Sequence, residues 1–139
     1  MTNELIFTTN SLFDNVAFDK DADSWRFYFS DNIYVSIYGF WRLLKNNKIT
    51  WVSFDHEQQF GLPEPIDLVE KLRQELADVR LTKIEVIKDT YDLTLILTNG
   101  FKIDIYISSS GYESYDFSIN DKRYIGLGSG NIAIFPKYK

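Results

Sequence analysis

Apolar and polar residues alternate along most of the chain, which is typical of strands with one buried face. The clearest run extends from Trp25 to Ile37, with apolar residues at odd positions on both sides of Asp31–Asn32. A second run extends from Leu93 to Ile107 around Asn99–Gly100, two residues that favour the positive φ angles of a tight hairpin turn. These runs predict two hairpins. Shorter alternating segments predict the remaining strands, at 41–44, 49–54, 84–89, 115–119, 124–127 and 132–135.

One segment follows a helical period. The loop 58–65 contains a glycine and two prolines, and Asp67 after it is followed three residues later by Glu70, a pattern close to a capping box. Apolar residues then recur at helical spacing, at Leu68, Val69, Leu72, Leu76 and Val79. The spacing predicts one amphipathic helix over residues 67–78.

The two halves of the chain resemble each other. With an offset of 68 residues, Phe27 falls on Leu95 and the turn Asp31–Asn32 falls on Asn99–Gly100. Six additional residues in the second half then bring Trp41 onto Tyr115. Because any two β-meanders share alternation, chance similarity is the alternative to a true repeat.

We therefore predict an α+β fold in a single domain, 1–139. Two antiparallel β-meanders form its halves, at about 24–56 and 84–135, and the helix 67–78 lies between them and packs on both.

Composition limits the chemistry that the chain can perform. Of its 139 residues, 45% are apolar and 17% are aromatic, enough for a core without a metal or a disulfide. The absence of cysteine excludes thiolate catalysis and cysteine-ligated metal sites, and it favours a cytoplasmic location. We find no signal peptide and no apolar run long enough for a membrane helix, so we expect a soluble protein without a cofactor.

Charge bears on the choice of partner. The chain has 15 Lys and Arg against 20 Asp and Glu, a net charge of −5, and its basic residues form no cluster. Such a surface repels a phosphate backbone, so we expect no nucleic-acid binding. A basic protein partner would suit it better.

Two groups of residues are candidates for catalysis. His56, the only histidine, lies between Asp55 and Glu57, where it could take part in metal binding or acid–base chemistry. Neighbours in an extended chain point to opposite faces, so we favour a histidine at a strand end that hydrogen-bonds into the following loop. The run Ser108–Gly111 lacks the context of a serine nucleophile and reads as a loop. We predict no catalytic residue and no metal ligand.

Tyrosines gather on one predicted face. Tyr28, Tyr34 and Tyr38 lie opposite the core face by parity, and tyrosine is frequent where proteins bind one another. A face covered by the helix or by a second copy of the chain is the alternative.

Three stretches carry a resemblance to known proteins: residues 55–63 (DHEQQFGLP), 109–115 (SSGYESY) and 124–130 (YIGLGSG). They resemble a group of small bacterial proteins, a domain of unknown function, some of which are similar to immunity proteins of polymorphic toxin systems. The resemblance covers the chain from about residue 24 onward. It implies a bacterial, cytoplasmic, single-domain protein, and it assigns no functional residue.

These observations lead to three functional hypotheses. The first is a non-enzymatic protein-binding module, such as an immunity protein that neutralises a basic toxin through Tyr28, Tyr34 and Tyr38. The second is a small-ligand binder with a cleft between the β halves, lined by His56, Tyr112 and Glu113. A hydrolase is the third and least favoured. Exposed edge strands are also compatible with a homodimer.

Overall fold

The computed structural model describes residues 5–136, and within this range the chain is built almost entirely of antiparallel strands. One α-helix, α1 (Leu68–Glu75), and one 3-10 turn, η1 (Ser53–Asp55), accompany them. The strands are β1 (Leu5–Asp19), β2 (Ser24–Phe29), β3 (Ile33–Ile37), β4 (Trp41–Lys45), β5 (Lys48–Val52), β6 (Arg80–Val86), β7 (Leu93–Leu97), β8 (Phe101–Ile105), β9 (Tyr115–Ile119), β10 (Lys122–Leu127) and β11 (Asn131–Pro136).

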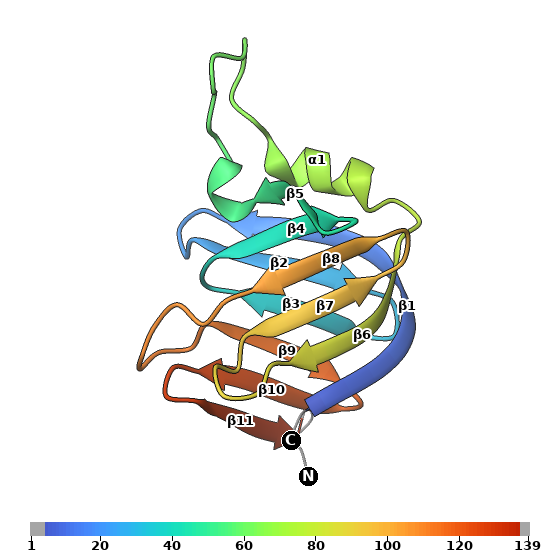
Figure 1. Cartoon of the computed structure of the whole chain (residues 1–139), viewed down its shortest axis with the longest axis vertical. Helices are drawn as coiled ribbons and strands as arrows, with labels where there is room; N and C mark the ends of the chain where they lie inside the picture. Colours follow the sequence, from blue (N-terminus) through green and yellow to red (C-terminus); the bar gives the residue numbers. More distant parts are fainter. Residues whose placement is uncertain (1–4, 137–139) are drawn as a thin grey trace.

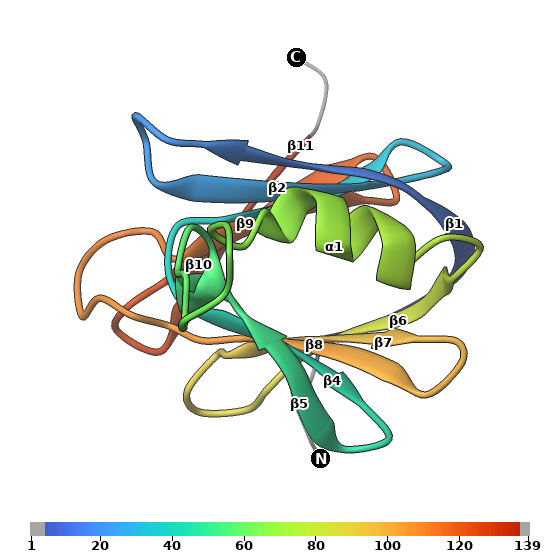
Figure 2. The same ribbon diagram turned by 90° about the horizontal axis from the view of Figure 1, so that it is seen from above.

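The strands form one continuous sheet that folds over on itself. Their order is β11-β10-β9-β3-β2-β1-β6-β7-β8-β4-β5. The sheet bends at β1, whose first part pairs with β6 and whose second part pairs with β2. Figure 2 shows the resulting two layers, joined by β1, with α1 between them at one end. The molecule is therefore a sandwich whose two layers share a strand.

Two irregularities lie where β1 passes from one layer to the other. Its register with β6 shifts between Thr8 and Ser11, and its register with β2 shifts between Phe13 and Asn15. Such bulges bend a strand and increase its twist. Ser11 is fully buried at this bend, where its hydroxyl lies 2.7 Å from Thr9 Oγ1 and donates to Asp31 Oδ2 at 2.8 Å. The polar group buried at the bend is thus satisfied.

The two predicted hairpin turns are confirmed, and two further two-residue turns have the same geometry. In each of them both residues have positive φ, for example 62° at Asn99 and 80° at Gly100. This conformation gives a two-residue hairpin the twist of its flanking strands, and asparagine, aspartate and glycine adopt it most readily. The other three turns are Asp31–Asn32, Asn46–Asn47 and Asn120–Asp121.

The predicted fold class, α+β with two separate meander halves, is wrong. The fold is predominantly β, and the part of the chain described contains one α-helix of eight residues. Neither half forms a sheet of its own, because β4 lies beside β8 instead of β3, and β9 lies beside β3 instead of β8. Alternation reports which face of a strand is buried, and it carries no information about which strand is its neighbour.

Within this corrected fold, strand pairs in the two halves have the same register. Trp25 lies opposite Ile37 in the β2–β3 pair, and Leu93 lies opposite Ile105 in the β7–β8 pair, an offset of 68 residues (25 to 93, 37 to 105). The β4–β5 and β9–β10 hairpins each pair with a strand of the other half, and they do so at equivalent positions. Trp41 of β4 is opposite Ile105, and Tyr115 of β9 is opposite Ile37. Each half therefore completes the layer that the other half begins.

The space between the layers is filled by large apolar side chains. Trp41 is fully buried, and its ring meets those of Trp25 and Phe27 edge to face at 5.2 and 5.4 Å between centroids. Contacts of this kind add to the free energy gained by burial.

Helix α1 closes one end of this core (Figures 1 and 2). Its N-cap is Asp67, whose carboxylate accepts a hydrogen bond from the backbone N–H of Glu70 at 3.2 Å. Leu68 and Leu72 point into the core and are fully buried, and Arg73 Nε donates to Asn15 Oδ1 of β1 at 2.9 Å. The helix is shorter than the predicted range 67–78, because Asp78 takes a φ of 64° before β6 begins. No helix within residues 5–136 is long and apolar enough to cross a membrane.

Gly126 provides a test of the packing between β9 and β10. It lies opposite Tyr115, and a Cβ at this position would collide with the buried tyrosine ring. We expect Gly126→Ala to lower the free energy of unfolding by about 1–3 kcal/mol, because the ring must move in a packed core. Urea denaturation measures the change.

Gly111→Ala is the matched control. No atom lies within 4 Å of a Cβ at Gly111, which sits in an exposed loop. Its free energy of unfolding should stay within about 0.5 kcal/mol of that of the unsubstituted protein. Equal stability of the two variants would show that Tyr115 does not pack on Gly126 as described.

Candidate functional site

A cavity of about 530 Å³ opens at one end of the sandwich. Its walls come from the ends of β1 and β3, the start of β2, the segment from η1 to Gln58, and Ser108 after β8. These segments are distant in sequence and meet where the chain crosses between the layers. The aromatic residues of its wall are Phe18, Trp25, Tyr38, Phe40 and Phe54.

His56 lies in the wall of this cavity and is held there by several contacts. Its ring meets the rings of Phe18 and Trp25 edge to face, at 4.9 and 5.2 Å between centroids. Its Nδ1 accepts a hydrogen bond from the backbone N–H of Leu68 at 3.1 Å. That N–H belongs to the first turn of α1 and has no acceptor within the helix. His56 therefore ties the helix to the aromatic wall, and its neutral form has the proton on Nε2.

The segment between η1 and α1 projects from this end of the molecule (Figure 1). Two backbone hydrogen bonds close its base: the Glu57 N–H donates to Ile66 O at 2.8 Å, and the Ile66 N–H donates to Gln58 O at 2.8 Å. We refer to residues 57–66 as the projecting loop. The closed base fixes where the loop leaves the sandwich.

The tip of the projecting loop displays apolar side chains. Phe60 and Gly61 reverse the chain with φ angles of 49° and 76°, and the Gln59 side-chain amide donates to Leu62 O at 2.8 Å. Phe60 is 68% exposed and Leu62 is 48% exposed. Two apolar side chains are thus exposed to solvent on a loop with internal hydrogen bonds, an arrangement that often marks an interaction site.

The three tyrosines predicted to bind a protein partner lie on the outer face of the layer that contains β2 and β3. Tyr28 is opposite Tyr34 in the register of the two strands, and both are half-buried. The Arg26 guanidinium lies over the Tyr34 ring, 4.6 Å from its centroid. Tyr38, just after β3, is 40% exposed and also lines the cavity. Tyr38 therefore connects the outer face with the cavity.

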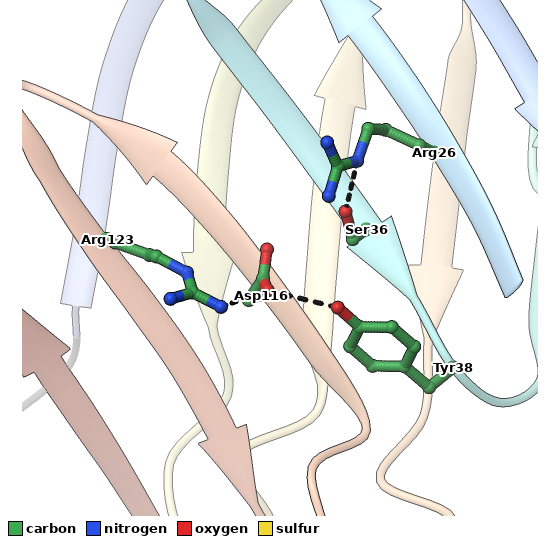
Figure 3. Close-up of polar contacts among 5 residues, drawn as sticks. All are labelled: Arg26, Ser36, Tyr38, Asp116 and Arg123. Carbon is green, nitrogen blue, oxygen red and sulfur yellow. Dashed lines mark hydrogen bonds and ion pairs between the residues drawn. The ribbon is translucent and has the colours of Figure 1, made fainter. Parts of the chain in front are cut away.

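A polar cluster occupies the same outer face (Figure 3). Asp116 is only 1% exposed, and its Oδ2 accepts from Arg123 Nη2 at 2.9 Å and from the Tyr38 hydroxyl at 3.1 Å. Beside it, Arg26 Nε donates to Ser36 Oγ at 2.6 Å. A buried carboxylate requires such donors, so Tyr38 and Arg123 serve to stabilise Asp116.

The second oxygen of this carboxylate is different. Asp116 Oδ1 is buried, and no hydrogen-bond donor contacts it within the described residues. Arg123 is thus paired with the carboxylate through Oδ2, while Oδ1 accepts no hydrogen bond from the described residues. Burial of the Tyr38 hydroxyl and the nearby Asp116 charge together raise the pKa of Tyr38 above its ordinary value.

The ligand-cleft residues of the second hypothesis are only partly brought together. His56 lines the cavity, whereas Tyr112, 81% exposed, and Glu113 lie in the β8–β9 loop outside its wall. Glu113 is close enough for its charge to contribute to the raised pKa of Tyr38. In the same loop, Ser109 Oγ accepts from the N–H groups of Gly111 and Tyr112, so this hydroxyl orders a turn. Within residues 5–136, no group of three or more His, Asp or Glu side chains could hold a metal ion.

Sequence reasoning missed most of the cavity wall. The alternation predicts only that Trp25 is buried, and it does not predict that Phe18, Phe40 and Phe54 line a cavity. One signal for the wall was present in the sequence. Phe54 is an apolar residue at the end of the predicted strand 49–54, and the polar residues Asp55 and His56 follow it directly.

Comparisons with known proteins identify no relative. No protein-family model matches the chain, no curated protein matches its sequence, and no solved structure matches its fold. The function must therefore be argued from the cavity, the projecting loop and the charges around them.

The bond from Leu68 to His56 can be tested by substitution. We expect His56→Phe to lower the free energy of unfolding by about 1 kcal/mol, because the ring is retained but the acceptor for the Leu68 N–H is lost. The exchange of that amide hydrogen should become faster. His56→Asn, whose side-chain oxygen can take the place of Nδ1, should recover part of the protection. Unchanged exchange in His56→Phe would disprove the bond.

The effect of Asp116 on Tyr38 is open to a titration. Tyrosinate is negative, so removing the neighbouring charge by Asp116→Asn should lower the pKa of Tyr38 towards the ordinary value of a tyrosine. Burial, the larger cause, remains, and the pKa should therefore stay above that value. NMR of the tyrosine Cζ carbons measures the titration, with Tyr38→Phe identifying the signal. An identical titration curve in Asp116→Asn would show that the carboxylate does not influence this hydroxyl.

Proposed function

We propose that this chain is a non-enzymatic protein-binding module whose partner presents a basic surface. An immunity protein that neutralises a toxin would be one such module, and some of the proteins that the sequence resembles are similar to immunity proteins. The observation that carries the proposal is the tip of the projecting loop, where Phe60 is 68% exposed on a loop closed at its base.

A preformed loop lowers the cost of binding. Residues that are already ordered before binding lose little conformational entropy when the partner docks. An aromatic side chain at the tip can fill a pocket of the partner, and such anchors supply much of the binding energy in protein interfaces. Phe60 and Leu62 are suited to this role.

Charge supports a basic partner. No Lys or Arg lies between Lys48 and Lys71, whereas Asp55, Glu57 and Glu64 do. Complementary charges accelerate association and select among partners more than they raise affinity. The segment that carries the apolar tip is therefore also negatively charged.

The tyrosine face remains a second candidate surface. Tyr28 and Tyr38 line a hollow of about 230 Å³ on the outer face, beside Arg26. Tyr34 and Tyr38 are already engaged by Arg26 and Asp116, so a partner would have to accommodate these contacts. Homodimer formation through the edge strands β5 and β11 likewise remains a prediction.

A pair of variants distinguishes the projecting loop from the tyrosine face as the binding surface. With the product of a neighbouring gene or another purified partner, we expect Phe60→Ser to weaken binding at least about tenfold, since a buried aromatic anchor contributes more than 1 kcal/mol. Tyr34→Ala should change the affinity little. Isothermal titration calorimetry measures both, and the association rate should fall as salt is added.

Ile49→Ser is the control, because Ile49 is 54% exposed on the edge strand β5 and lies outside the projecting loop. Its affinity should equal that of the unsubstituted protein. If Tyr34→Ala abolishes binding and Phe60→Ser does not, the tyrosine face is the binding surface and the projecting loop is not.

A further inference from the structure

The cavity at the end of the sandwich has two aromatic walls. One consists of Phe18 and Trp25, whose rings lie 4.7 Å apart between centroids, with His56 against both. The other consists of Phe40 and Phe54, at 5.1 Å between centroids. The Tyr38 ring lies at the wall as well. Aromatic faces carry partial negative charge, so several of them around one space attract a cation.

The charged residues of the wall have the same sign. Asp23 and Glu57 both line the cavity and are exposed, and no Lys or Arg is among the residues that line it. Behind the wall, the Tyr38 hydroxyl donates to the buried carboxylate of Asp116, whose charge is paired with Arg123, so the wall's own charge comes from Asp23 and Glu57. A positive charge in the cavity is therefore favoured by every charged group of its wall, and an anion is repelled.

The cavity also has a suitable size. Its volume of about 530 Å³ lies within the range of roughly 300–1,000 Å³ that is typical of small-molecule sites. Its uncharged polar groups include Ser53, whose hydroxyl oxygen already accepts from the backbone N–H of Trp41 at 3.2 Å. Mostly apolar walls with carboxylates near them suit a cation that carries alkyl groups better than a bare metal ion, which requires several converging oxygen ligands.

We propose that this cavity binds an organic cation, an alkylated ammonium group held against the aromatic rings and near the carboxylates of Asp23 and Glu57. The group can come from a free small molecule or from a trimethylated lysine side chain of a polypeptide, since both present a quaternary ammonium group. Only the base of the projecting loop, Glu57 and Gln58, lines the cavity, whereas Phe60 and Leu62 at its tip are not part of the wall.

The charge requirement is tested with two molecules of the same shape. Choline carries a quaternary ammonium group, and 3,3-dimethylbutanol replaces its nitrogen with carbon. We expect choline to bind at least about tenfold more tightly, because cation–π attraction and two carboxylates act only on the charged molecule. Titration followed by ¹H–¹⁵N NMR measures both dissociation constants, and the Trp25 indole signal should shift. Equal binding of the two molecules, or binding of neither, would overturn the proposal.

The location is tested with variants that leave the core intact. Phe54 is 72% exposed, so Phe54→Ala removes part of the wall without opening the core, and it should weaken choline binding about threefold or more. Glu57→Gln should weaken it roughly two- to fivefold, as expected for an exposed charge. The matched controls are Phe60→Ala and Glu64→Gln, which alter the projecting loop outside the cavity wall. Loss of affinity in the controls and not in Phe54→Ala would place the cation elsewhere and overturn the proposal.

A third molecule identifies the source of the cation. Nα-acetyl-trimethyllysine methylamide presents a trimethylated lysine side chain as a polypeptide would, and its binding is compared with that of choline. Tighter binding of the lysine compound indicates a polypeptide, and tighter binding of choline indicates a free quaternary ammonium compound. Phe60→Ser separates this site from the proposed function, since it should impair partner binding while leaving choline binding unchanged.

Discussion

The structure depends on a single strand that belongs to two layers. β1 pairs with β6 through its first part and with β2 through its second, and it bends where Ser11 is buried. Polar groups that are buried where the strand bends must find hydrogen-bond partners locally, and the hydroxyls of Thr9 and Ser11 with Asp31 do so. Without this bend the sheet would stay open, and one face of apolar side chains in each layer would be exposed to water.

The functional end of the molecule follows from how the layers are completed. Because β4–β5 crosses to the layer of β8, the chain between β3 and β4 passes over the end of the sandwich, as does the chain after β5. Phe40 and His56 lie on these crossings, where His56 contacts Phe18 of β1 and Phe40 lines the same cavity. At the positions equivalent to Phe18 and Trp25, the other half has Val86 and Leu93, so it does not repeat this aromatic wall.

Parts of this arrangement could be read from the sequence, because they depend on neighbours along the chain. The turn Asn99–Gly100 and the cap at Asp67 are local, and both lie where their residue types place them. β1 was missed because its inward positions include Thr9 and Ser11, which interrupt the apolar alternation at the bend. His56 was interpreted as a hydrogen-bonding residue at a strand end, but its partner, the N–H of Leu68, became visible only in the fold.

The sequence by itself determined most of the segments that become strands, with β1 as the exception, and also where the hairpins turn, where the helix starts and which sign of charge dominates, since these follow from side-chain type and spacing over a few residues. The tertiary structure alone decided that the hairpins exchange layers, that Asp116 is buried beneath Tyr38 and Arg123, and that aromatic residues far apart in sequence enclose one cavity. The physical reason is that a strand's alternation specifies its buried face, whereas its neighbours in the sheet are selected by long-range packing and the loss of chain entropy on closing each connection.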